Sequence, residues 1–185
     1  MMEEAKVKTA NTGPLGLLGF GMTTVILNLH NENIIELSVA IVAMGFAAGG
    51  LMQIIAGIFE LRRGNTFTGT AFVAYACFWW SLIFIWLNPG DVAAADGKSM
   101  GFYLLLWGIF SLFMFFGSLK HTRVTKVIFF TLVLLFFGLA ISDFTGSAAV
   151  GLVSGAIGIF CGSAAIYNAV GQILKEEYNR EILPL

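Results

Sequence analysis

Neutral polar side chains recur at helical spacing within long apolar stretches of this sequence. Phe20, Thr24 and Asn28 follow one another every four residues, a spacing that places an aromatic ring and two hydrogen-bonding groups on one face of a helix. Similar stripes in two other stretches carry Gln53, Asn168 and Gln172. Such side chains can line a path for a small polar solute, or they can hold helices together in lipid. The sequence leaves both interpretations open.

The sequence holds few groups that could do covalent or metal chemistry. His30 and His121 are the only histidines, and they fall at opposite ends of the expected membrane crossings, where they cannot complete a triad or a metal site. Cys77 and Cys161 lie deep in apolar runs and fit no zinc-ligand spacing. No Asp, Glu, Lys or Arg lies near the middle of an expected crossing. We therefore expect no enzyme activity, no metal and no cofactor.

Long apolar stretches must position these side chains. Hydrophobic residues make up 58% of the 185 residues and charged residues 11%, far from the balance of a soluble domain. Six stretches can each cross the hydrocarbon of a bilayer as a helix, which takes about 20 residues. They run at about 14–31, 34–61, 67–87, 100–119, 124–142 and 147–174. The sequence thus predicts an all-α integral membrane protein with six transmembrane helices, in a single transmembrane domain over residues 1–185.

The distribution of Lys and Arg predicts the orientation of these helices. Lys98 is alone on one side of the expected bundle, and the other nine of the ten basic residues share the opposite side. These nine are Lys6, Lys8, Arg62, Arg63, Lys120, Arg123, Lys126, Lys175 and Arg180. Because basic loops stay in the cytoplasm, both termini are expected there, in an inner or plasma membrane. The net charge of −1 provides no basic surface for nucleic acid.

The opening of the chain resembles that of a known family. Residues 11–17 read Asn-Thr-Gly-Pro-Leu-Gly-Leu, and Gly-Phe-Gly-Met-Thr-Thr at 19–24 and Asn-Leu-His-Asn at 28–31 follow. Further matches are Gly-Asn-Thr-Phe at 64–67, Leu-Phe-Met-Phe-Phe-Gly at 112–117, Cys-Gly at 161–162 and Ala-Ile-Tyr at 165–167. Over nearly its whole length the chain resembles the acetate uptake transporter family, which includes bacterial succinate-acetate permeases and fungal ammonia/acetate exporters. Thr12 and Gly13 replace Pro and Ala of the family's opening motif, an exchange expected to loosen the backbone.

The resemblance implies a homo-oligomer, a hexamer, in which each protomer has its own pathway for acetate and related short monocarboxylates, with succinate in some members. It implies a narrow apolar constriction formed by Phe20, Tyr75 and Leu132, and an influence of Leu132 and Ala165 on substrate choice. The resulting candidates for substrate binding are Asn11, Leu15, Thr24, Asn28, Gln53, Ala165 and Asn168.

We expect acetate to be handled without a buried cation, by helix N-termini and by hydroxyl or amide donors. The candidate donors are Asn11, Thr24, Tyr75 and Asn168. An apolar constriction would exclude hydrated ions, and because burying a bare carboxylate there is costly, passage as the acid or together with a proton is favoured. A proton-coupled carrier and an acetate-selective channel both fit. Two alternatives stay open, a channel for another small solute such as ammonia and a membrane scaffold without transport.

Overall fold

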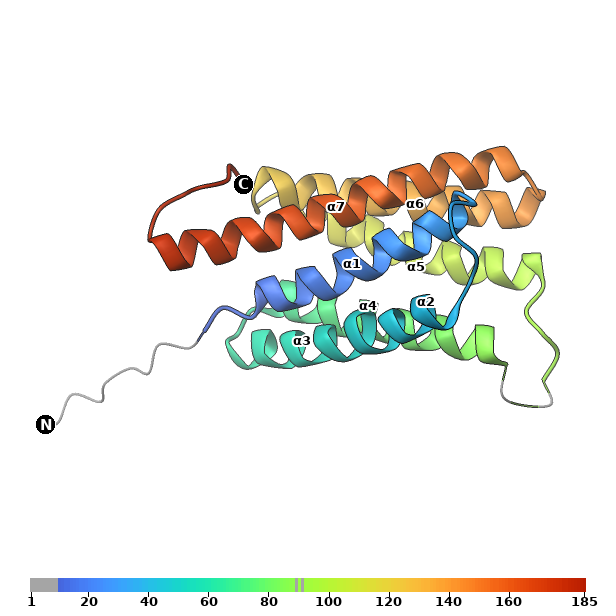
Figure 1. The fold of residues 1–185 in the computed structure, drawn as a ribbon, viewed down its shortest axis with the longest axis horizontal. Coiled ribbons are helices and arrows are strands. Elements are labelled where there is room, and N and C mark those ends of the chain that lie inside the picture. The colour runs from blue at the N-terminus through green and yellow to red at the C-terminus, as the bar shows by residue number, and fades with distance from the viewer. Residues whose placement is uncertain (1–9, 89, 91) are drawn as a thin grey trace, which may run out of the picture.

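The computed structural model describes residues 10–88, 90 and 92–185. All regular secondary structure in this part of the chain is helical, which confirms the expected all-α fold. Six long helical segments run alongside one another in alternating directions (Figure 1). They are α1 (Gly13–Asn31), the continuous run of α2 (Val39–Met44), η1 (Gly45–Met52) and α3 (Gln53–Arg62), then α4 (Thr66–Leu87), α5 (Gly97–Ser118), α6 (Arg123–Thr145) and α7 (Ala148–Tyr178).

Five of these segments are long and apolar enough to cross a membrane, namely Val39–Arg62 and the four helices from α4 to α7. The 19-residue α1 is not among them, since the polar residues Asn28, His30 and Asn31 at its end lower its mean hydropathy. α1 packs against α7 and against the η1–α3 segment. Because these neighbours shield it from lipid, it needs less apolar surface than an outer helix.

The helix ends differ most from the expected spans in two places. The second helix begins at Val39, whereas the expected span begins at 34, because Ser38 is extended (φ −139°, ψ 168°) and the helix can only start after it. α7 continues to Tyr178, beyond the expected end at 174. The remaining ends lie within about three residues of the expected ones.

Glycines bring α1 and α7 into close contact. A Cβ atom added to Gly21 would lie 2.7 Å from the carbonyl oxygen of Gly162, and one added to Gly162 would lie 2.7 Å from the carbonyl oxygen of Gly21. Gly158 makes room for the amide of Asn28 in the same way. Gly-xxx-Gly spacing in α7 therefore serves packing between two helices of one protomer.

Replacing Gly162 with alanine is expected to lower the unfolding free energy by about 1–3 kcal/mol, because backbone atoms, which cannot turn aside, occupy the space of the new methyl group. Thermal unfolding of the purified protein in detergent measures the change. Gly90→Ala is the matched control, since nothing lies within 4 Å of a Cβ atom there. Equal melting temperatures for the two variants would contradict the close contact.

The η1 segment departs from α-helical geometry within the second long helix. Its eight residues, Gly45–Met52, form a π-helix, a rare conformation that is frequent at functional sites. A Cβ atom at Gly49 would lie 2.6 Å from Cγ of Trp79, so the indole of α4 rests directly on the backbone here. The wide turn and Gly49 thus bring Trp79 close to the second helix, one turn before Gln53.

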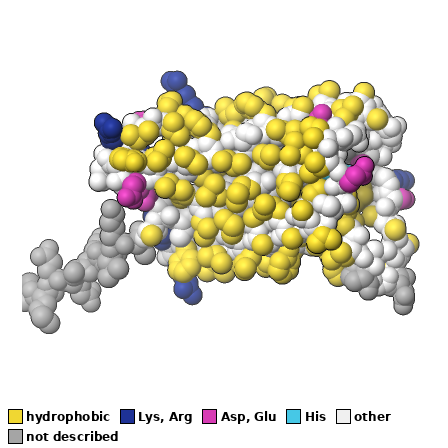
Figure 2. Space-filling model, in the orientation of Figure 1, with side chains coloured by type: hydrophobic (Ala, Val, Ile, Leu, Met, Phe, Trp, Pro, Cys, Tyr) yellow, Lys and Arg dark blue, Asp and Glu magenta, His cyan; other side chains and the backbone are white. Residues whose placement is uncertain are grey.

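On the face of the bundle that Figure 2 shows, hydrophobic side chains cover the middle and charged side chains lie toward the two ends. The outward-facing residues include large apolar ones from several helices, such as Phe46, Phe84, Leu106 and Phe113. This distribution suits a lipid environment for the sides and water for the ends. Together with the five long apolar helices, it describes a multi-pass membrane protein.

Candidate transport pathway

A cavity of about 300 Å³ enters the bundle from the end where α1, α4 and α6 begin. Its mouth lies among polar residues, including Asn11, His121 and Gln172, and its inner end is formed by Phe20, Tyr75 and Leu132. Residue 10 and the C-terminus lie at this same end of the bundle (Figure 1). The cavity runs from there to the middle of the helices.

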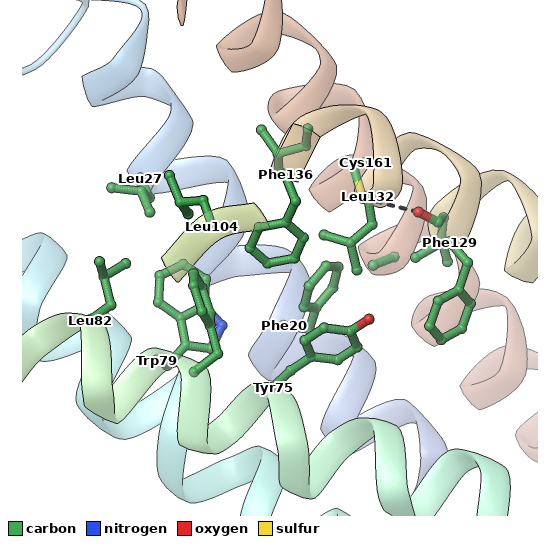
Figure 3. Close-up of a cluster of buried hydrophobic side chains, with 14 of the residues drawn as sticks. Phe20, Leu27, Tyr75, Trp79, Leu82, Leu104, Phe129, Leu132, Phe136 and Cys161 are labelled. Atoms are coloured by element: carbon green, nitrogen blue, oxygen red, sulfur yellow. Dashed lines mark hydrogen bonds between the residues drawn. The ribbon is translucent and has the colours of Figure 1, made fainter. Parts of the chain in front are cut away.

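Phe20, Tyr75 and Leu132 converge from α1, α4 and α6 (Figure 3). All three side chains are buried, and the ring centroids of Phe20 and Tyr75 are 6.0 Å apart. These residues are called the gate below. Beyond the gate lies a packed apolar cluster, called the outer cluster, which comprises Leu27, Trp79, Leu82, Leu104 and Phe136.

The hydroxyl of Tyr75 is hydrogen-bonded to α5. It lies 2.9 Å from Oγ of Ser111, which itself donates to the carbonyl oxygen of Trp107. Because the single hydroxyl hydrogen of Ser111 is used in this way, Tyr75 donates to Ser111. The residue therefore presents its ring to the cavity, and the expectation that its hydroxyl supplies a donor to a solute is not supported.

Amide and hydroxyl groups form a hydrogen-bonded chain along one wall of the mouth. Asn11 Nδ2 donates to Gln172 Oε1 (3.1 Å), and Gln172 Nε2 donates to Asn168 Oδ1 (3.1 Å). Asn168 Nδ2 donates in turn to Thr125 Oγ1 (3.2 Å). Each amide nitrogen carries two hydrogens and uses one within the chain. The remaining N–H groups can bind a carboxylate or another acceptor in the cavity.

Four of the expected binding residues do not line the cavity. Thr24 donates to the carbonyl oxygen of Phe20 (2.7 Å), and Asn28 Nδ2 donates to the carbonyl oxygen of Thr24 (2.8 Å), so both are satisfied within α1. Leu15 is half-buried outside the cavity, and Ala165 is fully buried in the core. For Thr24 and Asn28 the structure therefore favours the packing interpretation.

A buried carboxylate, Glu60, holds the entrance together. The residue is only 3% exposed, and its carboxylate accepts hydrogen bonds from Thr12 Oγ1 (2.7 Å) and Asn65 Nδ2 (2.8 Å). Arg63 Nη1 lies 3.2 Å from the same carboxylate. The Gly13 N–H donates to Asn11 Oδ1 (3.0 Å). Thr12 and Gly13 thus each make a hydrogen bond at the entrance, and the expectation that this pair loosens the backbone stays a prediction.

The charges along the cavity are few. Among the described residues that line it, Glu60 is the only acid, and no Lys or Arg takes part. His121 lies at the mouth, where its ring stacks on Phe67 with centroids 4.5 Å apart. An anion entering the cavity meets amide and hydroxyl dipoles and no full positive charge on Lys or Arg. Among the lining residues outside the candidates from the sequence are Glu60 and Thr125, together with Asn65, Thr68 and Thr122.

The fold and the cavity define the class of the protein: a helical membrane protein whose pathway leads from a polar mouth to an apolar gate. The sequence model of the GPR1/FUN34/yaaH family matches residues 1–183, so the chain belongs to this family and the resemblance seen in the sequence is confirmed. Several of its relatives are named as transport proteins, among them a bacterial symporter and a yeast ammonia transport protein.

Three relatives illustrate the family. The succinate-acetate/proton symporter SatP of Escherichia coli (strain K12) is 49% identical over 180 residues, which cover 96% of each chain. Ammonia transport outward protein 2 of Saccharomyces cerevisiae is 38% identical over 92% of this chain and 64% of its own length. The structure of the bacterial acetate channel SatP superposes with a TM-score of 0.94 at 49% identity, covering 96% of this chain and 99% of the other.

Proposed function

We propose that this protein carries acetate and related short carboxylates, succinate among them, across a membrane through the cavity and the gate. The observation that carries the proposal is the cavity itself, which joins a wall of amide donors to an apolar constriction. A volume of about 300 Å³ lies at the lower end of the range for small-molecule pockets. The names of the bacterial relatives support the choice of acids.

A proton accompanies the acid in this proposal. The amide groups at the mouth suit a carboxylate, but the gate offers no charge or donor that could replace the hydration of an anion. Moving a bare carboxylate through such a ring costs far more than moving the neutral acid. Both a proton-coupled carrier and an acid-selective channel meet this requirement.

The proposed orientation places both termini in the cytoplasm of an inner or plasma membrane. The described basic residues at the end of the cavity mouth are Arg62, Arg63, Lys120, Arg123, Lys126, Lys175 and Arg180, whereas Lys98 lies at the other end. Basic loops favour the cytoplasmic side. The cavity then opens to the cytoplasm. Assembly of this chain into a hexamer, with one pathway in each protomer, is part of the proposal and rests on the family resemblance.

Uptake of labelled acetate into liposomes that contain the purified protein tests the proposal. It is measured with and without an inward proton gradient, and with excess unlabelled succinate, propionate or formate. If the proton gradient drives acetate to a higher concentration inside the liposomes than outside, the protein is a proton-coupled carrier. If acetate only reaches equal concentrations on both sides, the protein is a channel. Ammonia flux without acetate flux would favour the activity named for the yeast relative. No flux above empty liposomes would favour a scaffold.

Leu132→Ala is expected to broaden uptake toward propionate and larger acids, because it shortens a side chain that forms the gate. Competition of unlabelled propionate against labelled acetate measures the change. Ala165→Ser is expected to have a smaller effect, since Ala165 is buried in the same apolar cluster but does not line the cavity. Unchanged selectivity in Leu132→Ala would contradict the assignment of the gate.

A further inference from the structure

Two buried polar atoms beside the gate have no hydrogen-bond partner among the described residues: Gln53 Oε1 and Trp79 Nε1. Gln53 is fully buried, and Trp79 is 2% exposed. Buried polar groups are nearly always paired, so an unpaired one calls for an explanation. The two atoms are also complementary. An amide oxygen can only accept a hydrogen bond, and an indole N–H can only donate one.

Both atoms belong to the same part of the bundle, because their residues meet at Gly49. The indole of Trp79 rests on Gly49, and Gln53 Nε2 donates to the Gly49 carbonyl oxygen (2.7 Å). That bond fixes the orientation of the Gln53 side-chain amide, because the carbonyl oxygen of Gly49 can accept a hydrogen bond only from the amide nitrogen. The oxygen of Gln53 is therefore the unpaired atom.

The pair borders the gate from two sides. Gln53 lines the cavity together with Phe20 and Tyr75. Trp79 follows Tyr75 by one turn of α4, and Figure 3 shows its indole nitrogen on the ring edge that faces Phe20. An acid at the inner end of the cavity lies beside the Gln53 oxygen, and the Trp79 N–H lies next to the gate, although Trp79 itself does not line the cavity.

A carboxylic acid fits this pair only in its neutral form. The neutral acid has one O–H donor and one carbonyl acceptor, whereas the ionised form is acceptor-only and would face the Gln53 oxygen with repulsion. No Lys or Arg among the described lining residues offsets that repulsion.

We infer that Gln53 Oε1 and Trp79 Nε1 together form a recognition site for the undissociated form of a short carboxylic acid. The acid O–H donates to Gln53 Oε1, and Trp79 Nε1 donates to the acid carbonyl. The inference rests on the proposed function and adds the protonation state of the solute at the gate. Each acid then crosses with one proton and no net charge, without a side chain that carries the proton.

The first test separates the two forms of the solute in liposomes that contain the wild-type protein. Initial rates of labelled acetate uptake are measured at several pH values, equal on both sides, with the membrane potential clamped by potassium and valinomycin. One series holds the concentration of the anion constant, and the other holds that of the undissociated acid constant. Rates in empty liposomes are subtracted. We expect the rate to follow the undissociated acid and to be independent of the potential.

The second test removes the indole N–H alone. Benzothienylalanine, in which sulfur replaces the N–H group, is incorporated at position 79. The uptake rate is expected to fall about tenfold, as for the loss of one buried hydrogen bond. The matched control carries the same substitution at position 80, because Trp80 Nε1 donates to the carbonyl oxygen of Phe46 away from the cavity. Gln53→Met tests the acceptor, with thermal unfolding to show that the variant is folded.

The outcomes separate the inference from the proposed function. No acetate uptake by the wild-type protein would overturn both. Uptake that follows the anion and the membrane potential would overturn the inference and leave the proposed function in place. Wild-type rates in both the position-79 analogue and Gln53→Met would also overturn it, and would assign the two atoms to bound water. Infrared spectra with labelled acetate give a readout besides flux, since a bound neutral acid shows a carbonyl band and a carboxylate does not.

Discussion

Phe20→Ala is expected to open the pathway to solutes larger than acetate. The ring forms one side of the gate and packs against Tyr75, so its removal leaves a gap between the cavity and the outer cluster. We expect proteoliposomes with this variant to admit succinate and small neutral solutes at rates close to that of acetate. Light scattering during osmotic swelling, with a series of solutes of increasing size, measures the change in selectivity.

The same substitution is also expected to lower the unfolding free energy by about 3 kcal/mol, at the low end for a buried phenylalanine because Phe20 already borders a cavity. Phe84→Ala is the matched control, since Phe84 faces outward with 65% of its surface exposed. If Phe20→Ala retained the solute selectivity of the wild type while remaining folded, the gate would have to lie elsewhere in the bundle.

Asn168→Leu is expected to slow acetate uptake roughly 10- to 100-fold, the equivalent of one lost hydrogen bond to a charged group. Asn168 is the centre of the amide chain at the mouth, and its removal leaves Gln172 Nε2 and Thr125 Oγ1 without their partner. Initial rates at low acetate concentration measure the effect. The loss is expected mainly as weaker binding, so saturating acetate should recover part of the rate.

Ser154→Ala serves as the control for Asn168→Leu. Ser154 is a buried polar residue of the same helix, but its hydroxyl donates to the carbonyl oxygen of Val150 and does not reach the cavity. Equal uptake by the two variants would show that the amide chain has no part in binding.

The helices could be predicted from the sequence because their causes are local. Apolar stretches of sufficient length form helices in lipid wherever they occur, and breaks such as Asn88 or the loop at Gly64 end them through left-handed backbone conformations. The extended segment before Val39 was missed, because Ile34 and Ile35 are as apolar as the helix that follows. The π-helical geometry of η1, where Gly49 contacts Trp79, was also missed.

The site could be predicted only in part. Helical spacing correctly indicated that Thr24 and Asn28 share a buried face, but periodicity does not reveal whether a polar side chain bonds to its own helix or to a solute. The gate residues came from the resemblance to a family, and the structure brings them together. The amide chain joins Asn11 to Gln172 across 161 positions of sequence. Thr125 and Glu60 belong to the site only through such distant contacts.

The position of the cavity mouth determines which solution the proposed binding residues sample. A solute at the amide chain exchanges with the aqueous phase at that end only, because the outer cluster closes the other side. Its occupancy follows the acid concentration on one face of the membrane. A competitor confined to the opposite face of a sealed vesicle displaces it only when Leu27, Leu82 and Leu104 move apart. Comparing a competitor added on one face of the membrane with the same competitor added on the other face therefore measures how often the outer half of the bundle opens.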